Sequence, residues 1–154
     1  SRFLTLTKGT GVINRIFHGY GKFEGEMDGR KNGALISMST GKAVAFAIFN
    51  LQARGEMFVT HNDPVYEGMI VGLTPKPGDM IINVMKGKKL TNMRTQGTDE
   101  NVVLTPVRQM SIAEQLSILN TDEALEITPK SLRLRKAILD PHERKKSEKS
   151  GAAA

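Results

Sequence analysis

Four cations lie within nine residues in the middle of the chain, and no acidic residue lies among them. They are Lys86, Lys88, Lys89 and Arg94. Lysine and arginine bind the phosphates of nucleic acids through charge and counterion release. Uncharged donors suited to sugar and phosphate oxygens share the stretch. These donors are Thr91, Asn92, Thr95, Gln96 and Thr98. Because aromatic platforms for unpaired bases are missing, the stretch predicts contact with the backbone and shape of a folded RNA.

A second basic segment spans residues 130–149, with eight cations and three acidic residues. The net charge of the chain is +6, so its basicity is concentrated in these two places, as in a nucleic-acid footprint. Leucines alternate with arginines in the first part of the segment, which predicts a strand with the cations on one face and the leucines in the core. The candidate RNA contacts here are Lys130, Arg133, Arg135 and Lys136. The alternative is an ordinary solvated basic surface.

No residue pattern in the chain indicates catalysis. The Gly-Lys pairs at 41–42 and 87–88 are followed by Ala and Lys, so neither forms a nucleotide-binding phosphate loop. A small hydrolase using His61 and Asp63 is the enzymatic alternative, but no second metal ligand stands at a recognisable spacing, and a turn over residues 61–64 explains both residues. We therefore expect no catalytic, cofactor-binding or metal-binding residue and no enzyme activity in this chain.

Length and composition predict one ordinary domain, or one domain with a fragment of another, in 154 residues. The longest apolar run, residues 43–49, is far short of the roughly 20 residues of a membrane span. The chain has no cysteine, which suits a reducing compartment. We expect a cytoplasmic protein without a membrane partner.

The basic stretch joins two apolar, β-prone runs, residues 80–85 and 101–104. This pattern predicts a hairpin with a loop over residues 86–100, much longer than the two to five residues that are usual. Loops of such length are commonly functional. Without RNA, the tip over residues 88–97 should be the most mobile part of the domain.

The remaining elements predict an α+β fold: a β-rich domain with two or three short helices and a long basic hairpin loop. One helix should end at Gly55, which follows Arg54 as a C-terminal cap, and another should begin at the capping box of Ser111 and Glu114. The C-terminal tail should be helical for a turn or two at most. Strands are expected over residues 12–20, 34–38, 56–60, 65–73 (broken by Gly68 and Gly72) and 131–136, and helices over residues 42–53 and 111–120.

Several motifs together resemble the C-terminal part of the BipA (TypA) family of ribosome-associated translational GTPases. The most specific are KGKKLTNMR at 86–94 with GTDE at 97–100, and TPKSLRLRK at 128–136. Further matches, in family order, are FLT with KGTG at 3–11, GKAVAF at 41–46, LQARG at 51–55 and VYEG at 65–68.

The resemblance implies a division of the chain into three parts. Residues 1–24 would be the end of an elongation-factor-G-like α/β sandwich domain, with its last strand at 11–20. Residues 25–140 would be the family's C-terminal domain, and residues 141–154 a flexible basic tail. The GTP-binding domain has no counterpart here, so GTP and Mg²⁺ are expected only for the parent protein.

The resemblance also implies a partner, the ribosome. In that family the long basic loop is associated with large-subunit rRNA near the acceptor end of A-site tRNA, in translation, stress response or ribosome assembly. The resemblance carries this role over to Lys86, Lys88, Lys89, Asn92 and Arg94, and Arg133, Arg135 and Lys136 match a basic strand of the family. Together with Thr95, Thr98 and Lys130, which the residue pattern itself indicates, these are the expected RNA-binding residues. The competing interpretation is a docking module whose first residues pack against the missing N-terminal domains of the parent, with surface basicity that has no function.

Overall fold

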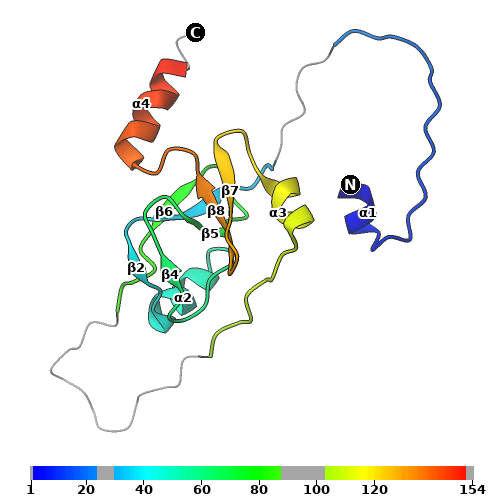
Figure 1. The fold of residues 1–154 in the computed structure, drawn as a ribbon. Coiled ribbons are helices and arrows are strands. Elements are labelled where there is room, and N and C mark those ends of the chain that lie inside the picture. The colour runs from blue at the N-terminus through cyan, green and yellow to red at the C-terminus, as the bar shows by residue number, and fades with distance from the viewer. Residues whose placement is uncertain (1, 24–29, 88–102, 152–154) are drawn as a thin grey trace, which may run out of the picture.

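The computed structural model describes residues 2–23, 30–87 and 103–151, and its centre is a four-stranded sheet (Figure 1). Its strand order is β3-β5-β1-β6. The strands are β1 (Ala34–Ser37), β3 (Glu56–Met57), β5 (Ile70–Leu73) and β6 (Met80–Ile82). The central strand β1 pairs antiparallel with β5 and parallel with β6. All four residues of β1 are buried, so side chains pack against both faces of the sheet.

Each face of the sheet carries its own hydrophobic core, because successive side chains of a strand point to opposite sides. Leu35 and Val71 belong to the core that includes Ile48 and Leu51 of helix α2 (Ala45–Gln52). Ala34, Ile36 and Ile70 belong to the other core, with Leu134. The sheet therefore lies between α2 and a two-stranded hairpin.

That hairpin consists of β7 (Glu123–Ile127) and β8 (Leu132–Lys136), which pair in register over five residues. Helix α3 (Ile112–Ile118) precedes it, and Ile118 and Leu119 pack against the same core as Leu134. The other elements are α1 (Arg2–Leu6), the short pair β2 (Gly41–Lys42) and β4 (Pro64–Val65), and α4 (Pro141–Gly151).

The α+β prediction is confirmed, and so are several local features. Ser111 accepts a hydrogen bond from the Glu114 amide while the Glu114 carboxylate accepts from the Ser111 amide, which is the predicted capping box. Gly68 breaks the 65–73 segment with a φ of +82°. Gly72 does not break it: Gly72 lies within β5, where a Cβ atom would stand 2.4 Å from the Glu56 carbonyl oxygen.

The prediction that Gly55 caps a helix is wrong. Helix α2 ends at Gln52 with Ala53 as its C-cap, in a right-handed conformation, and φ at Gly55 is not positive. Gly55 instead lies against β5, where a Cβ atom would stand 2.1 Å from the Leu73 carbonyl oxygen. Close backbone packing, rather than a turn, requires glycine there.

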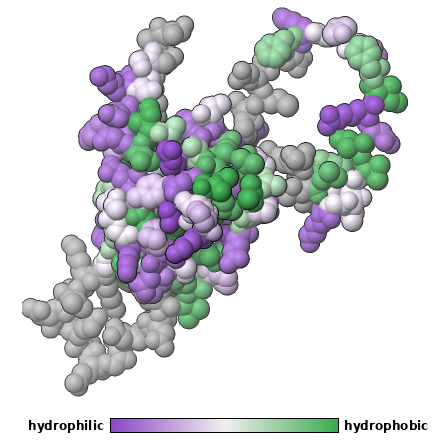
Figure 2. Space-filling model, in the orientation of Figure 1, coloured by the Kyte–Doolittle hydropathy of each residue, from purple (hydrophilic) through white to green (hydrophobic). Residues whose placement is uncertain are grey.

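Residues 11–23 form neither helix nor strand, so the strand predicted over residues 12–20 is absent. A strand needs a neighbour that accepts its backbone hydrogen bonds, and no described residue supplies one here. Large apolar side chains along this segment, including Ile16, Phe17 and Tyr20, are exposed. Figure 2 shows apolar surface distributed along this arc.

The hairpin predicted around residues 86–100 is also wrong in its described arms. The entering strand β6 pairs with β1 rather than with the chain that follows it, and residues 103–110 contain no strand. Apolar content alone therefore misidentified the second arm. The tip at 88–97, predicted to be mobile, lies outside the described residues.

The C-terminal tail forms a longer helix than predicted. Helix α4 spans eleven residues, and the Asp140 carboxylate accepts hydrogen bonds from the amides of His142 (2.7 Å) and Glu143 (2.9 Å). Pro141 occupies the first helical position, where its missing N–H costs nothing. An N-cap aspartate followed by proline is a helix-start signal that the sequence does contain.

Candidate nucleic-acid interface

The chain entering the basic stretch is fastened to the start of α2. Val84 is fully buried, and its carbonyl accepts a hydrogen bond of 2.9 Å from the Val44 amide. The Asn83 side chain then accepts from the Met85 amide, which turns the chain outward. Lys86 follows and is exposed. Lys86, the first cation of the stretch, therefore lies at the protein surface directly after a segment that is held by hydrogen bonds.

The chain leaving the stretch is fastened to the same helix near its other end. The side-chain nitrogen of Gln52 donates to the Thr105 carbonyl (2.8 Å), and the side-chain oxygen of Gln52 accepts from the backbone amide of Thr105 (3.1 Å). Leu104 packs against the core on the α2 side of the sheet. Both described flanks are thus held by α2. Lys88, Lys89, Asn92, Arg94, Thr95 and Thr98 lie outside the described residues.

The predicted contacts on β8 fall into two environments. Lys130 is exposed in the connection between β7 and β8. Arg133 and Arg135 are half-buried on the face of the strand that the alternation predicted. The Arg133 guanidinium lies 3.4 Å from a Glu126 carboxylate oxygen, and Arg135 donates to the backbone carbonyl of Lys136 at 3.2 Å.

Glu126 also accepts a hydrogen bond of 2.6 Å from the Tyr66 hydroxyl. Burial, followed by this hydrogen bond, raises the pKa of Tyr66 to about 12. Tyr66 therefore stays protonated and holds Glu126 beside Arg133. A phosphate approaching Arg133 would meet a cation that already has an acidic partner.

The structure places Lys136 in a different environment from the other predicted RNA contacts on β8. Lys136 lies on the same face of β8 as Leu132 and Leu134, and it is 2% exposed. Its ammonium forms ion pairs with Asp122 (2.6 Å), Glu123 (3.2 Å) and Asp79. In this position the charge neutralises the protein's own carboxylates, which argues against a contact between Lys136 and a phosphate.

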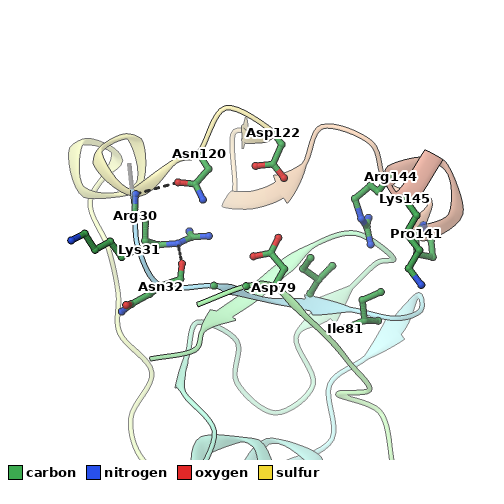
Figure 3. Close-up of a pocket in the computed structure, with 13 residues that line it drawn as sticks. Arg30, Lys31, Asn32, Asp79, Ile81, Asn120, Asp122, Pro141, Arg144 and Lys145 are labelled. Carbon is green, nitrogen blue, oxygen red and sulfur yellow. Dashed lines mark hydrogen bonds between the residues drawn. The ribbon is translucent and has the colours of Figure 1, made fainter. Parts of the chain in front are cut away.

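Arg30, which the sequence did not single out, completes this cluster. Its guanidinium lies 2.7 Å from the fully buried Glu123 carboxylate. It also donates to the Ile118 carbonyl at 3.2 Å, while its backbone amide donates to the Asn120 side chain (Figure 3). Arg30, Asp79, Asp122, Glu123 and Lys136 form the buried charge cluster, which is named for the buried Glu123 and Lys136 at its centre; Asp122 lies at its exposed edge.

Two members of the buried charge cluster have shifted pKa values. Burial by itself lowers the pKa of Lys136, but hydrogen bonds to Asp122 and Asp79 outweigh it and raise the value overall. Burial raises the pKa of Asp79, but hydrogen bonds from the Ala34 amide and Lys136 lower it overall. Both shifts favour the charged forms, the Asp79 carboxylate and the Lys136 ammonium, which form an ion pair with each other.

A cleft of about 450 Å³ lies beside this cluster, between the sheet and the start of α4. Figure 3 shows Arg144 and Lys145 on one side of it and Arg30 and Lys31 on the other. Asp79 and Asp122 also line it. Since acids stand among its cations, the cleft is not a simple anion site.

The segment at residues 61–64 is a turn, as predicted, with Asn62 at a φ of +68°. The His61 Nδ1 atom accepts a hydrogen bond from the Ala45 amide at the start of α2, and the Asp63 carboxylate accepts from the Thr60 amide. Both side chains therefore have local structural roles. Within the described ranges, no group of three or more His, Cys, Asp or Glu residues could hold a metal ion.

No helix in residues 2–23, 30–87 or 103–151 is long and apolar enough to cross a bilayer.

The chain is similar to relatives named large ribosomal subunit assembly factor BipA. It is 51% identical over 148 residues to the protein from Buchnera aphidicola subsp. Schizaphis graminum, 46% over 148 residues to that from Salmonella typhimurium and 45% over 151 residues to that from Escherichia coli strain K12. These alignments cover 96–97% of this chain but only 24–25% of each relative. The chain thus spans about a quarter of the length of the curated relatives it matches.

A domain family described as "TypA/BipA C-terminal domain" matches residues 32–141. The match covers the sheet, α2, α3 and the hairpin of β7 and β8. Together with the sequence identity of 45–51% over nearly the whole chain, it assigns the fold and the basic stretch to one family. The chain belongs to the TypA/BipA C-terminal domain family.

Proposed function

We propose that this chain is a ribosome-binding module that contacts large-subunit rRNA, with A-site tRNA as a second RNA partner. The observation that carries the proposal is the attachment of both flanks of the basic stretch to α2, through Val84 and through Thr105. The stretch that carries four cations without an acidic neighbour in sequence therefore leaves and re-enters the described domain beside the same helix. The name of the relatives, large ribosomal subunit assembly factor, supports the ribosome as the partner.

The RNA-binding residues that we propose are Lys86, Lys88, Lys89, Asn92, Arg94, Thr95 and Thr98, with Lys130, Arg133 and Arg135 as weaker contacts. Arg133 contributes less because Glu126 neutralises part of its charge. The module acts in the cytoplasm. GTP hydrolysis with Mg²⁺ belongs, in this proposal, to a separate domain of a longer parent protein, and this chain performs no catalysis.

The test is the binding of the 154-residue chain to purified large ribosomal subunits across a salt series. Replacement of Lys88, Lys89 and Arg94 by Gln should weaken binding and reduce the slope of log affinity against log salt by about 2 to 3, since each phosphate contact contributes roughly 0.7–0.9. The matched control replaces Lys145, Lys146 and Lys149 of α4, which removes the same charge. Binding that does not depend on salt, or an equal effect of both triple variants, would contradict the proposal.

A second candidate function is docking against another domain of the parent. It is favoured by the exposed apolar side chains of residues 11–23, among them Ile16, Phe17 and Phe23, because contiguous exposed apolar surface usually marks an interface. The chain should then self-associate in sedimentation at high concentration, whereas a shortened chain beginning at Gly25 should remain monomeric. Equal sedimentation of the two chains would exclude docking through this segment.

A further inference from the structure

A groove of about 350 Å³ lies between α2 and the chain that leaves β6. Its α2 side presents Phe46, Asn50 and Arg54, spaced four residues apart and so on one face of the helix and its continuation. Its other side presents Ile81, Asn83 and Lys86. The groove opens directly beside the point where the chain enters the basic stretch.

The charge of this groove distinguishes it from the cleft beside α4 and from a larger groove beneath the hairpin of β7 and β8. Arg54 and Lys86 are exposed cations, and none of the described residues that line the groove carries a carboxylate. By contrast, Asp79 and Asp122 line the cleft beside α4. Asp63 lines the larger groove beneath the hairpin of β7 and β8. A cation with no carboxylate beside it can turn its hydrogen-bond donors to an external anion.

The carboxyl end of α2 carries a partial negative charge, and Arg54 stands where it offsets that charge. This interaction alone would account for a cation at position 54. The interaction with the helix end is one of charge and does not use up the paired N–H donors of the guanidinium group, whose geometry matches the oxygens of a phosphate. Because Arg54 balances the negative end of the helix, the charge of Lys86 remains unbalanced, and the groove is net positive.

Polar and apolar groups in the groove also suit a nucleic-acid backbone. Asn50 is exposed, and its side-chain nitrogen donates to the Phe46 carbonyl at 2.7 Å. This hydrogen bond does not use the side-chain oxygen, which can accept from a ribose hydroxyl. The exposed Ile81 and half-buried Phe46 give the groove an apolar wall against which a sugar can pack. An acidic peptide would use the cations but not this combination.

We propose that the α2–β6 groove binds one RNA backbone segment, with Arg54 and Lys86 on its phosphates and Asn50 on a ribose. The groove would extend the footprint of the basic stretch back onto the folded domain. The inference rests on the proposed RNA-binding function and adds Arg54 and Asn50, which the sequence did not assign to it.

The experiment compares Arg54→Gln with Arg108→Gln in the 154-residue chain, with purified large ribosomal subunits as the probe across a salt series. Arg108 is the matched control because it is exposed and already pairs with Glu56 and Glu114. Arg54→Gln should lower affinity roughly tenfold at low salt and reduce the salt slope by about 1, whereas Arg108→Gln should leave both nearly unchanged.

A second pair of variants tests the groove by adding charge instead of removing it. Asn50→Asp places a carboxylate beside Arg54 in the α2–β6 groove and should weaken binding severalfold, while Gln109→Glu adds the same charge at an exposed site in the groove beneath the hairpin. This pair decides the matter if Arg54→Gln lowers the melting temperature. Equal effects of Asn50→Asp and Gln109→Glu would overturn the groove.

The outcomes separate the two proposals. If the unsubstituted chain shows no salt-dependent binding, the proposed function fails and the groove with it. If the unsubstituted chain binds, the Lys88, Lys89 and Arg94 variant binds more weakly, and Arg54→Gln behaves like Arg108→Gln, only the groove is overturned. A loss of affinity in Arg54→Gln without a change of salt slope would indicate a protein surface and would also overturn the assignment to RNA backbone.

Discussion

Two regions of this domain use cations in opposite ways. In the buried charge cluster, Lys136 and Arg30 neutralise carboxylates of the protein itself. In the α2–β6 groove, Arg54 and Lys86 are exposed, and no carboxylate stands among the described residues that line the groove with them. Residue type does not distinguish the two regions, since both hold one lysine and one arginine. The placement of acids decides whether a cation stabilises the fold or is available to a ligand.

Arg133 lies between these extremes. It is half-buried and 3.4 Å from Glu126, which itself is partly exposed. Such pairs contribute about 1 kcal/mol or less. Arg133 can therefore exchange its acidic partner for a phosphate at small cost, whereas Lys136 cannot.

The largest effect is expected from Lys136→Met, which leaves the fully buried Glu123 with one cation fewer. Removal of one partner from a buried ionic network typically costs about 3–5 kcal/mol of unfolding free energy, measurable by urea denaturation. Lys146→Met, on the exposed face of α4, should cost about 0.5 kcal/mol at most. Similar losses in the two variants would break the distinction between the regions.

The pH dependence of stability should carry the signature of the buried charge cluster. The lowered pKa of Asp79 stabilises the fold above its ordinary value of 3.8, and this contribution is lost as pH falls through the lowered value. The raised pKa of Lys136 contributes fully below 10.5 and is lost as pH rises through the raised value. Urea midpoints between pH 2 and 12 should fall at both ends. The alkaline decline should be weaker in Lys136→Met, and an unchanged decline would contradict the role of Lys136.

The smallest effect is expected from Glu126→Gln, which releases Arg133 while retaining an acceptor for the Tyr66 hydroxyl. Affinity for large ribosomal subunits should rise by up to about fivefold, because the exposed pair is worth about 1 kcal/mol or less. Glu143→Gln on α4 is a control with the same charge change. A gain that is equal in both variants would reflect net charge rather than the release of Arg133.

Local signals in the sequence predicted local structure well. The capping box of Ser111 and Glu114 formed as expected, because both partners lie within one turn. The arginines of β8 lie on the predicted face, because alternation along a strand is also a local property of the sequence. The N-cap Asp140 before Pro141 was equally readable, and giving it full weight would have predicted α4.

Long-range pairing set the limit of prediction. The alternation in β8 does place Lys136 with Leu132 and Leu134, but a basic residue on a core face is credible only once its acidic partners are known. Asp79 comes from a distant part of the chain, whereas Asp122 and Glu123 lie 14 and 13 positions before Lys136, at the start of the β7–β8 hairpin. Arg30 pairs with a residue 93 positions away, and no local pattern announces it. The α2–β6 groove likewise exists only because β6 pairs with β1 instead of forming a hairpin.

The most direct test of RNA binding through the α2 side of the domain is a cryo-electron microscopy map of the 154-residue chain bound to the large ribosomal subunit. The account predicts rRNA phosphates within hydrogen-bonding distance of Lys86 and Arg54, with Lys136 enclosed by Asp79, Asp122 and Glu123 as in the free domain. A map in which the α2–β6 groove faces solvent or a ribosomal protein, while another surface contacts RNA, would contradict it.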